Sequence, residues 1–185
     1  MAYPSARPVR GRISHDGGVA GTEHVTALFA GGARPRAYLA SPLGFSEAGR
    51  AYYAEHYLPA LCEHVEPVDP WTLSAPEEFA AALAAGRSRE LGLAVGARNA
   101  RAIAGAQLVI AHLDGQEVDA GTASEVGYAA ALRLPCLAVR SDLRESGEPG
   151  MVVNLQVEAF VALSGGFLVR SLEELLSELA DLRRG

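Results

Sequence analysis

The sequence predicts an α/β domain, a three-layer sandwich in which a five-stranded, mainly parallel sheet lies between two layers of helices. From Arg36 onward, short apolar runs alternate about five times with longer segments of helical period, and such alternation favours a parallel sheet with helices on both faces. The run "QLVIAHL" is almost entirely apolar, as expected for a strand that is buried on both faces. With 185 residues, 49% of them hydrophobic, the chain can form one domain with a sizeable core.

The elements follow from apolar periodicity and from turn and cap signals. The expected strands are residues 36–41, 64–69, 107–113, 135–140 and 167–169. The expected helices are residues 46–63, a helix that Ser74 opens, and residues 88–104, 122–132, 154–163 and 171–184. The patterns Ser74-x-x-Glu77 and Thr122-x-x-Glu125 both fit a capping box. Residues 1–35 are rich in glycine and proline, so we expect a mostly flexible extension with one short helix, followed by a domain over residues 36–185.

Charge and composition exclude several classes of function. The net charge of −6 argues against nucleic-acid binding, which needs a basic face, and favours a small ligand. Cys62 and Cys136 fit no metal-ligand spacing, and neither do the histidines, so no metal or cofactor is expected. The N-terminus lacks the apolar core of a secretory signal and no apolar run approaches the ~18 residues of a membrane span. These patterns predict a cytoplasmic protein without membrane contact.

Three carboxylates stand in the stretch "DGQEVDAGTASEVGYA", which begins after the most apolar strand. In open parallel sheets, ligands bind beyond the carboxyl ends of the strands. A cap stabilises a helix by about 1 kcal/mol, which would account for Glu125 without any chemistry. Such a cap does not explain Asp114 or Asp119, however. Carboxylates that converge there could hold sugar hydroxyls, while one of them attacks an anomeric carbon, as in retaining glycosidases.

These residues belong to a series of motifs that resembles the nucleoside 2-deoxyribosyltransferases over roughly residues 36–180. The matching segments are "YLASPLGF" (38–45), "GARNARAIAGAQLVIAHLDG" (96–115), "VDAGTASEVGYA" (118–129), "NLQVEAF" (154–160) and "LSGG" (163–166). The fold expected with this resemblance is a flavodoxin-like or Rossmann-like three-layer sandwich. Gly-Thr-x-x-Glu alone would be weak, but the ordered series is fairly specific.

The resemblance implies roles for individual residues. Glu125 would be the nucleophile that takes the deoxyribosyl group from one base and passes it to another, with Tyr38 orienting it. Asp119 would bind sugar hydroxyls. Asn154 would reach the 5′-hydroxyl end of a site in a neighbouring subunit, since family members are oligomers with shared active sites. The predicted substrate-binding set also includes Asp114, Gly121 and Ser41, together with Phe45 and Trp71 as aromatic side chains for the base.

One position departs from the family pattern. Several family members carry an aspartate that handles the proton of the leaving base, where this chain has Asn99. Asparagine can hydrogen-bond a base edge but cannot act as a general acid. The base would then be protonated by solvent or by another group, with Asp114 and His112 as weak candidates, or the activity differs. For His112, which lies within a strand, packing is the favoured interpretation.

Three functions remain open from the sequence. The first is a transferase that exchanges bases on 2′-deoxyribose, and the second is an N-glycoside hydrolase of nucleosides or their monophosphates that uses the same glutamate. The third is a nucleoside or nucleotide sensor without turnover. The loop "SPLGFSEAGR" lacks the glycine and arginine cluster of a phosphate loop, which favours nucleosides over nucleotides. The cytokinin-activating phosphoribohydrolases are also similar around Gly-Thr-x-x-Glu, but their run of glycines before the threonine is missing here.

Overall fold

The structure is a computed structural model that describes residues 9–10, 12–13, 19–20, 23–144 and 146–184. Most of the extension predicted for residues 1–35 therefore lies outside the described residues. Residues 23–35 are described, and they are part of the domain. Helix α1 (Glu23–Leu28) places Val25 and, one turn later, Phe29 in the core with no exposed surface, because side chains four residues apart lie on one side of a helix.

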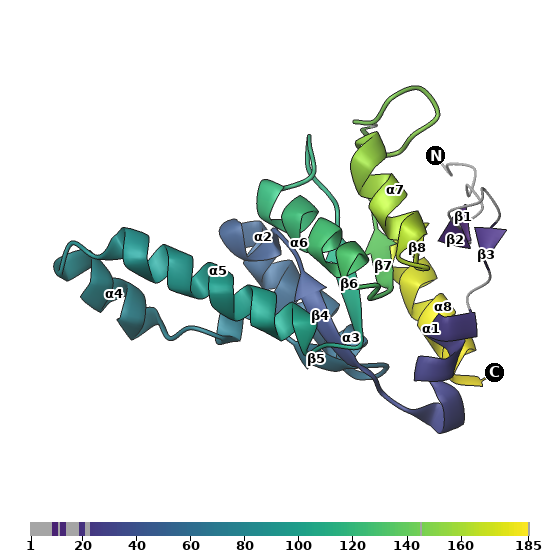
Figure 1. The fold of residues 1–185 in the computed structure, drawn as a ribbon, viewed down its shortest axis with the longest axis horizontal. Helices are drawn as coiled ribbons and strands as arrows, with labels where there is room; N and C mark the ends of the chain where they lie inside the picture. The colour runs from purple at the N-terminus through teal and green to yellow at the C-terminus, as the bar shows by residue number, and fades with distance from the viewer. Residues whose placement is uncertain (1–8, 11, 14–18, 21–22, 145, 185) are drawn as a thin grey trace.

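Five parallel strands form the centre of the molecule (Figure 1). In spatial order they are β5 (Glu66–Val68), β4 (Arg36–Ala40), β6 (Leu108–His112), β7 (Cys136–Val139) and β8 (Phe167–Val169). In chain order this is 2-1-3-4-5, the flavodoxin-like arrangement, so the predicted fold class is confirmed. A short strand, β1 (Val9–Arg10), adds an antiparallel edge beside β8, and β2 (Arg12–Ile13) pairs with β3 (Val19–Ala20) in a separate sheet.

Helices cover both faces of the sheet, and the two cores follow the alternation of side chains along the strands. Leu39 and Ile110 face one core, which includes Phe29, Leu61 and Leu175. The helices on this side are α1, α2 (Glu47–Tyr52), α3 (Leu58–Cys62) and α8 (Leu172–Arg184). A π-helical turn (Tyr53–Tyr57) joins α2 to α3, so the predicted helix over residues 46–63 is continuous.

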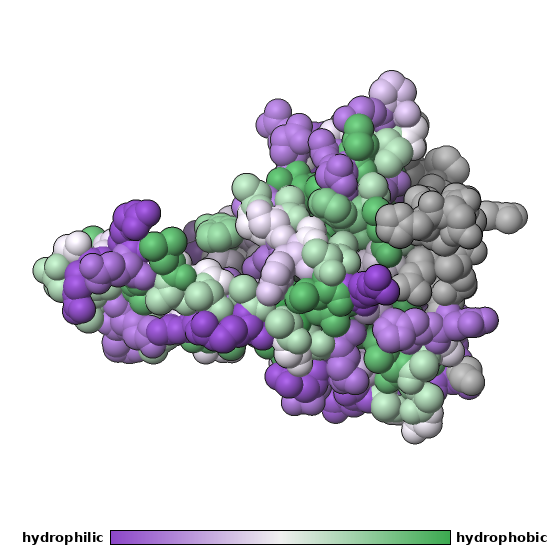
Figure 2. All heavy atoms as spheres, viewed as in Figure 1, coloured by the Kyte–Doolittle hydropathy of each residue, from purple (hydrophilic) through white to green (hydrophobic). Residues whose placement is uncertain are grey.

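Tyr38 and Val109 face the second core together with Ile103, Val126 and Val157. The helices on this side are α5 (Ser88–Ala104), α6 (Ala120–Ala131) and α7 (Leu155–Leu163). Helix α4 (Pro76–Ala84) and the adjoining part of α5 project from the body of the molecule as an arm (Figures 1 and 2).

Two helices begin elsewhere than the capping patterns predict. Helix α4 begins at Pro76 without a side-chain cap, and Ser74 instead accepts a hydrogen bond from Arg98 at 2.7 Å. Helix α6 begins at Ala120, because the Asp119 carboxylate accepts a hydrogen bond from the Thr122 N–H at 2.9 Å and is the true N-cap. The predicted cap role of Glu125 is therefore wrong, since Glu125 lies in the second turn, beyond the unpaired N–H groups.

The topology brings the loops after β4 and β6 to one crevice. β4 and β6 are hydrogen-bonded neighbours, but the chain leaves β4 toward the face that carries α2 and leaves β6 toward the face that carries α6. Adjacent strands whose connections depart to opposite faces leave a gap at their carboxyl ends, which is where open α/β sheets bind ligands.

Candidate active site

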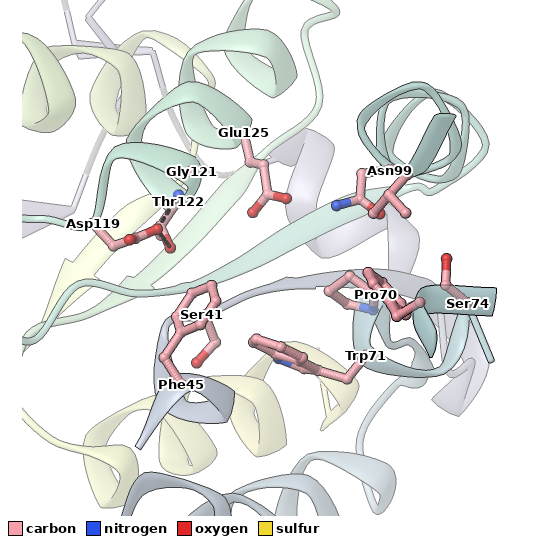
Figure 3. Close-up of a pocket in the computed structure, with 12 residues that line it drawn as sticks. Ser41, Phe45, Pro70, Trp71, Ser74, Asn99, Asp119, Gly121, Thr122 and Glu125 are labelled. Carbon is pink, nitrogen blue, oxygen red and sulfur yellow. Dashed lines mark hydrogen bonds between the residues drawn. The ribbon is translucent and has the colours of Figure 1, made fainter. Parts of the chain in front are cut away.

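A cavity of about 370 Å³ lies at this crevice (Figure 3). It is formed by the segments that follow β4 and β5, by one side of α5 and by the start of α6. The residues that line it are Ser41, Phe45, Pro70, Trp71, Ser74, Phe79, Val95, Asn99, Asp119, Gly121, Thr122 and Glu125. Seven of the predicted site residues thus meet at one place: Ser41, Phe45, Trp71, Asn99, Asp119, Gly121 and Glu125.

Tyr38 does not line the cavity but contacts the Glu125 carboxylate, which does. Its ring is fully buried in the core between the sheet and α6, and its hydroxyl donates a hydrogen bond of 2.5 Å to Glu125 Oε1. Burial, and after it the hydrogen bond to Glu125, raises the pKa of Tyr38 well above its ordinary value. The phenol therefore remains a hydrogen-bond donor to the carboxylate, and this contact is the one that the resemblance implies for the pair.

Burial also raises the pKa of Glu125 above its ordinary value, and the charge of Asp119 adds to this increase. The hydrogen bond from Tyr38 acts in the opposite direction and lowers the pKa. Glu125 is thus a desolvated carboxylate with one oxygen fixed in position. A carboxylate that water solvates poorly and a neighbouring donor orients is suited to nucleophilic attack.

Asp119 has two roles at the N-terminus of α6. Its Oδ2 accepts hydrogen bonds from both the N–H and the hydroxyl of Thr122, and its side chain also lines the cavity. Figure 3 shows Asp119 and Glu125 on the same side of the cavity, with Asp119 at the N-cap of α6 and Glu125 in its second turn. A carboxylate at this place can accept hydrogen bonds from hydroxyl groups of a ligand.

Two aromatic side chains form the wall below Glu125 (Figure 3). Phe45 follows β4 and Trp71 follows β5, and their rings meet edge to face at 4.9 Å between centroids. Phe45 is 71% exposed and Trp71 41%, so both rings still offer surface to a ligand. Gly44 allows this wall to form, because a Cβ at that position would lie 2.3 Å from Trp71 Cε2.

Asn99 faces this wall and Glu125 from α5. Figure 3 shows the amide nitrogen of Asn99 directed toward the Glu125 carboxylate across the cavity. The amide oxygen is buried and has no hydrogen-bond partner among the described residues. The next residue toward the N-terminus, Arg98, binds Ser74 at 2.7 Å and Glu78 at 2.6 Å and so attaches α4 to α5.

Sequence reasoning missed several lining residues: Pro70, Ser74, Phe79, Val95 and Thr122. Phe79 and Val95 come from the arm, and neither carries a chemical motif. The one available signal is the spacing of Val95 and Asn99, which places them one turn apart on α5.

Two predicted site residues lie away from the cavity. Asp114 accepts hydrogen bonds from the N–H groups of Ser141 and Asp142 at 2.6 and 2.9 Å, and so fastens the end of β6 to the segment after β7. Asn154 is the N-cap of α7 and accepts a hydrogen bond from the Gln156 N–H at 3.0 Å. Neither residue is among those that line the cavity.

His112 is packed rather than exposed to a ligand. It is 5% exposed, and its ring meets the Tyr57 ring edge to face at 5.4 Å between centroids. Burial lowers the pKa of His112 below its ordinary value, although the charge of Asp114 opposes this. His112 therefore remains neutral inside the core at neutral pH.

Of the described lining residues, only Asp119 and Glu125 have ionisable acidic side chains. The described lining includes no lysine, arginine or histidine. Within the described part of the chain, no cluster of three or more histidine, cysteine, aspartate or glutamate side chains could hold a metal ion. No helix in the described ranges is long and apolar enough to cross a membrane.

Comparison with known proteins yields one family. The model of the family described as "Nucleoside 2-deoxyribosyltransferase" matches residues 37–162, which include all the lining residues of the cavity. No curated protein matches the chain significantly.

Two similar solved structures differ in how closely they resemble this chain. A conserved protein from Enterococcus faecalis V583 is 25% identical, with a TM-score of 0.58, and the match covers 80% of this chain and 99% of that one. The CMP N-glycosidase BcmB from Clostridium botulinum is 17% identical, with a TM-score of 0.47, over 78% of this chain and 97% of the other.

Proposed function

Because the chain belongs to the nucleoside 2-deoxyribosyltransferase family, we propose that it transfers 2-deoxyribose between nucleobases through a covalent intermediate on Glu125. One observation carries the proposal. A desolvated carboxylate, fixed by a 2.5 Å hydrogen bond from a buried tyrosine, faces a cavity of about 370 Å³ with an aromatic wall. A cavity of this size falls in the range of small-molecule sites.

The reaction would use Glu125 twice. Its carboxylate attacks C1′ of a bound nucleoside, the glycosidic bond to the base breaks, and a glycosyl ester remains on the enzyme. A second base then attacks C1′ and releases the carboxylate. Splitting one difficult displacement into two easier ones is the general benefit of covalent catalysis. The hydrogen bond from Tyr38 keeps the attacking carboxylate in one orientation, which supplies part of the benefit of proximity.

The other lining residues fit the two halves of a nucleoside. Asp119 can accept hydrogen bonds from sugar hydroxyls beside Glu125. Phe45 and Trp71 offer exposed aromatic surface on which a base can stack. These assignments place the sugar against α6 and the base between the aromatic wall and Asn99, as expected from the resemblance.

A free nucleoside suits the cavity better than a nucleotide. A phosphate group needs cationic side chains or clustered N–H donors, whereas the described lining residues carry two carboxylates and no cation. We therefore expect 2′-deoxynucleosides to react at least about 10-fold faster than their 5′-monophosphates at equal concentration, because a phosphate would meet like charge.

Hydrolysis is the second candidate function, and the exposure of the aromatic wall favours it. Phe45 is 71% exposed, so water can reach the cavity when no acceptor base covers the glycosyl ester. The same glutamate would then pass its sugar to water instead of to a base. Transfer and hydrolysis differ only in the second step, and one experiment separates them.

The test is chromatography of the purified protein with mixed 2′-deoxynucleosides and free bases, with and without acceptor base. Glu125→Gln should reduce activity by at least about 10³-fold, since it removes the nucleophile but keeps a carbonyl oxygen for Tyr38. Glu117→Gln is the matched control, because Glu117 is exposed in the same segment and does not line the cavity.

The products identify the reaction. New deoxynucleosides that depend on Glu125 would support transfer, whereas free base and free deoxyribose alone would support hydrolysis. Tight nucleoside binding in calorimetry without any product would contradict both and favour a sensor. Full activity in Glu125→Gln would overturn the proposed mechanism.

A further inference from the structure

Among the described residues that line the cavity, no side chain is a free general acid that could give a proton to a departing base. Of the two carboxylates, Glu125 is the proposed nucleophile and must itself be ionised to attack. Asp119 is the N-cap of α6, and its Oδ2 serves as a hydrogen-bond acceptor for both the N–H and the hydroxyl of Thr122. The remaining described lining residues are uncharged, and none is histidine or cysteine. The phenol of Tyr38 already donates to Glu125.

Asn99 occupies the position across from the nucleophile, where the base would leave. Its amide nitrogen is directed toward Glu125 in Figure 3, while its amide oxygen is buried behind it. An amide N–H donates a hydrogen bond but keeps its proton. A donor fixed in advance toward an atom that gains negative charge lowers the barrier of a reaction, as in an oxyanion hole.

Building on the function proposed above, we propose that the base leaves this site as an anion, which the Asn99 amide stabilises by hydrogen bonding. The site then selects its substrates by how well their bases carry a negative charge. In uracil and its 5-substituted derivatives, two ring carbonyls share the charge left on N1. In cytosine, only one carbonyl does so. The preferred substrates are therefore 2′-deoxynucleosides of the uracil type, ahead of those of cytosine.

The step balances without an acid. A Glu125 oxygen forms a bond to C1′, and the C1′–N1 bond breaks with its electron pair moving to N1. The negative charge that Glu125 loses on becoming an ester reappears on the base, so the total charge within the cavity does not change during the displacement. The base anion takes its proton from water after it leaves. In the second half, an acceptor base that has lost its N1 proton to water attacks C1′ and restores the carboxylate.

The experiment measures base release in a single turnover, with the protein in excess over the nucleoside and rapid quenching. The substrates are 5-fluoro-2′-deoxyuridine, 2′-deoxyuridine, thymidine and 2′-deoxycytidine, which share one sugar and one ring size. We expect the rate to fall in that order, as the acidity of the free base falls. Deoxycytidine should be slower than deoxyuridine by about 10²-fold or more, the factor that a general acid would otherwise supply.

Variants of Asn99 separate anion stabilisation from simple contact. Asn99→Ala should reduce the rate of base release from deoxyuridine by about 10²- to 10³-fold, which is the usual loss when one preorganised donor is removed. Asn99→Asp introduces an ionisable group that could give a proton to the base. It should therefore reduce the difference in the rate of base release between deoxyuridine and deoxycytidine. Gln116→Glu adds the same charge at an exposed residue that does not line the cavity, and it should leave this difference unchanged.

The outcomes distinguish this inference from the proposed function. Base release that depends on Glu125 but is equally fast for all four nucleosides would overturn the anionic departure while leaving the proposed function intact. A deoxyuridine preference that Asn99→Asp leaves unchanged would also overturn it. Failure to release any base, or release that persists in Glu125→Gln, would instead contradict the proposed function.

Discussion

At the scale of single residues, the hydrogen bond from Tyr38 influences the pH above which Glu125, the proposed nucleophile, is ionised. The bond stabilises the charged carboxylate and so lowers the pKa of Glu125, against the larger effect of burial. Tyr38→Phe removes this stabilisation and must raise the pKa of Glu125 further. Because the nucleophile is the deprotonated form, the acid limb of kcat/KM should move to higher pH. A pH–rate profile of deoxynucleoside cleavage measures this shift.

Tyr57→Phe provides the control for this experiment. Tyr57 is also a fully buried tyrosine, it belongs to the core on the other face of the sheet, and it makes no hydrogen bond with the Glu125 carboxylate. Its variant should keep the acid limb of the parent protein. An acid limb that stays in place or moves to lower pH in Tyr38→Phe would show that Tyr38 does not stabilise the charged nucleophile.

At the scale of elements, helix α6 positions both carboxylates of the described cavity lining. Asp119 starts this helix by accepting the Thr122 N–H, and Glu125 follows in the second turn. Asp119→Ala should lower the free energy of unfolding by about 1 kcal/mol, the usual cost of losing an N-cap side chain. Asp119→Asn keeps a carbonyl oxygen at the same place and should retain most of the stability. Urea unfolding followed by circular dichroism measures both.

The two variants also distinguish the capping role of Asp119 from its proposed role in binding sugar hydroxyls. If Asp119 binds sugar hydroxyls as well, both variants should raise the KM for deoxynucleosides, whereas only Asp119→Ala should unfold earlier. An Asp119→Ala protein as stable as the parent would mean that the cap contributes little to α6. Thr122→Val offers a comparison, because it removes the hydroxyl that contacts Asp119 but keeps the N–H that Asp119 caps.

The sequence predicted which segments form strands and helices more accurately than it predicted where the helices begin. The strands were recognisable because burial on both faces requires apolar runs such as Leu108–His112. The start of α6 was not, since Thr122-x-x-Glu125 and Asp119-x-x-Thr122 both have the form of a cap, and only the path of the chain decides between them. Glu125, Asp119 and Tyr38 were predicted as site residues from the motif series, and the structure brings Glu125 and Asp119 to the cavity and Tyr38 against Glu125. Phe79 and Val95 were missed because the packing of the arm brings them to the cavity, and neither residue type suggests chemistry.

At the scale of the whole molecule, the resemblance predicts an oligomer in which Asn154 completes the site of a neighbouring subunit. Within one chain, Asn154 lies outside the cavity and caps α7. Large apolar side chains are exposed on α4 to α7. They include Phe79, Leu83, Leu93, Tyr128, Leu132, Leu155 and Leu163. Such residues are candidates for a subunit interface.

Mixing two inactive variants tests whether the site is shared. Glu125→Gln and Asn154→Ala should each lose activity alone, but their mixture after unfolding and refolding together should regain part of it. The reason is that a mixed oligomer contains sites with both parent residues. No recovery, in a mixture that light scattering shows to be oligomeric, would place Asn154 outside the neighbouring site. A monomeric parent protein would contradict the shared site directly.

The residues of the cavity come from two parts of the fold, which are the sheet with α6 on one side and α4 with α5 on the other. Tyr38 lies on the sheet, Glu125 lies on α6 with Asp119 at its N-cap, and hydrogen bonds join Tyr38 to Glu125 and Thr122 to Asp119. Asn99, Ser74, Phe79 and Val95 come from α4, α5 and the segment before them. Substitutions of Ser74, Phe79 or Val95 can therefore alter which base is accepted without changing Glu125, Tyr38 or Asp119, whereas Asn99 contributes both to base binding and to the proposed departure of the base. Base preference is thus an evolvable trait that most of this part of the cavity can change without replacing the proposed nucleophile.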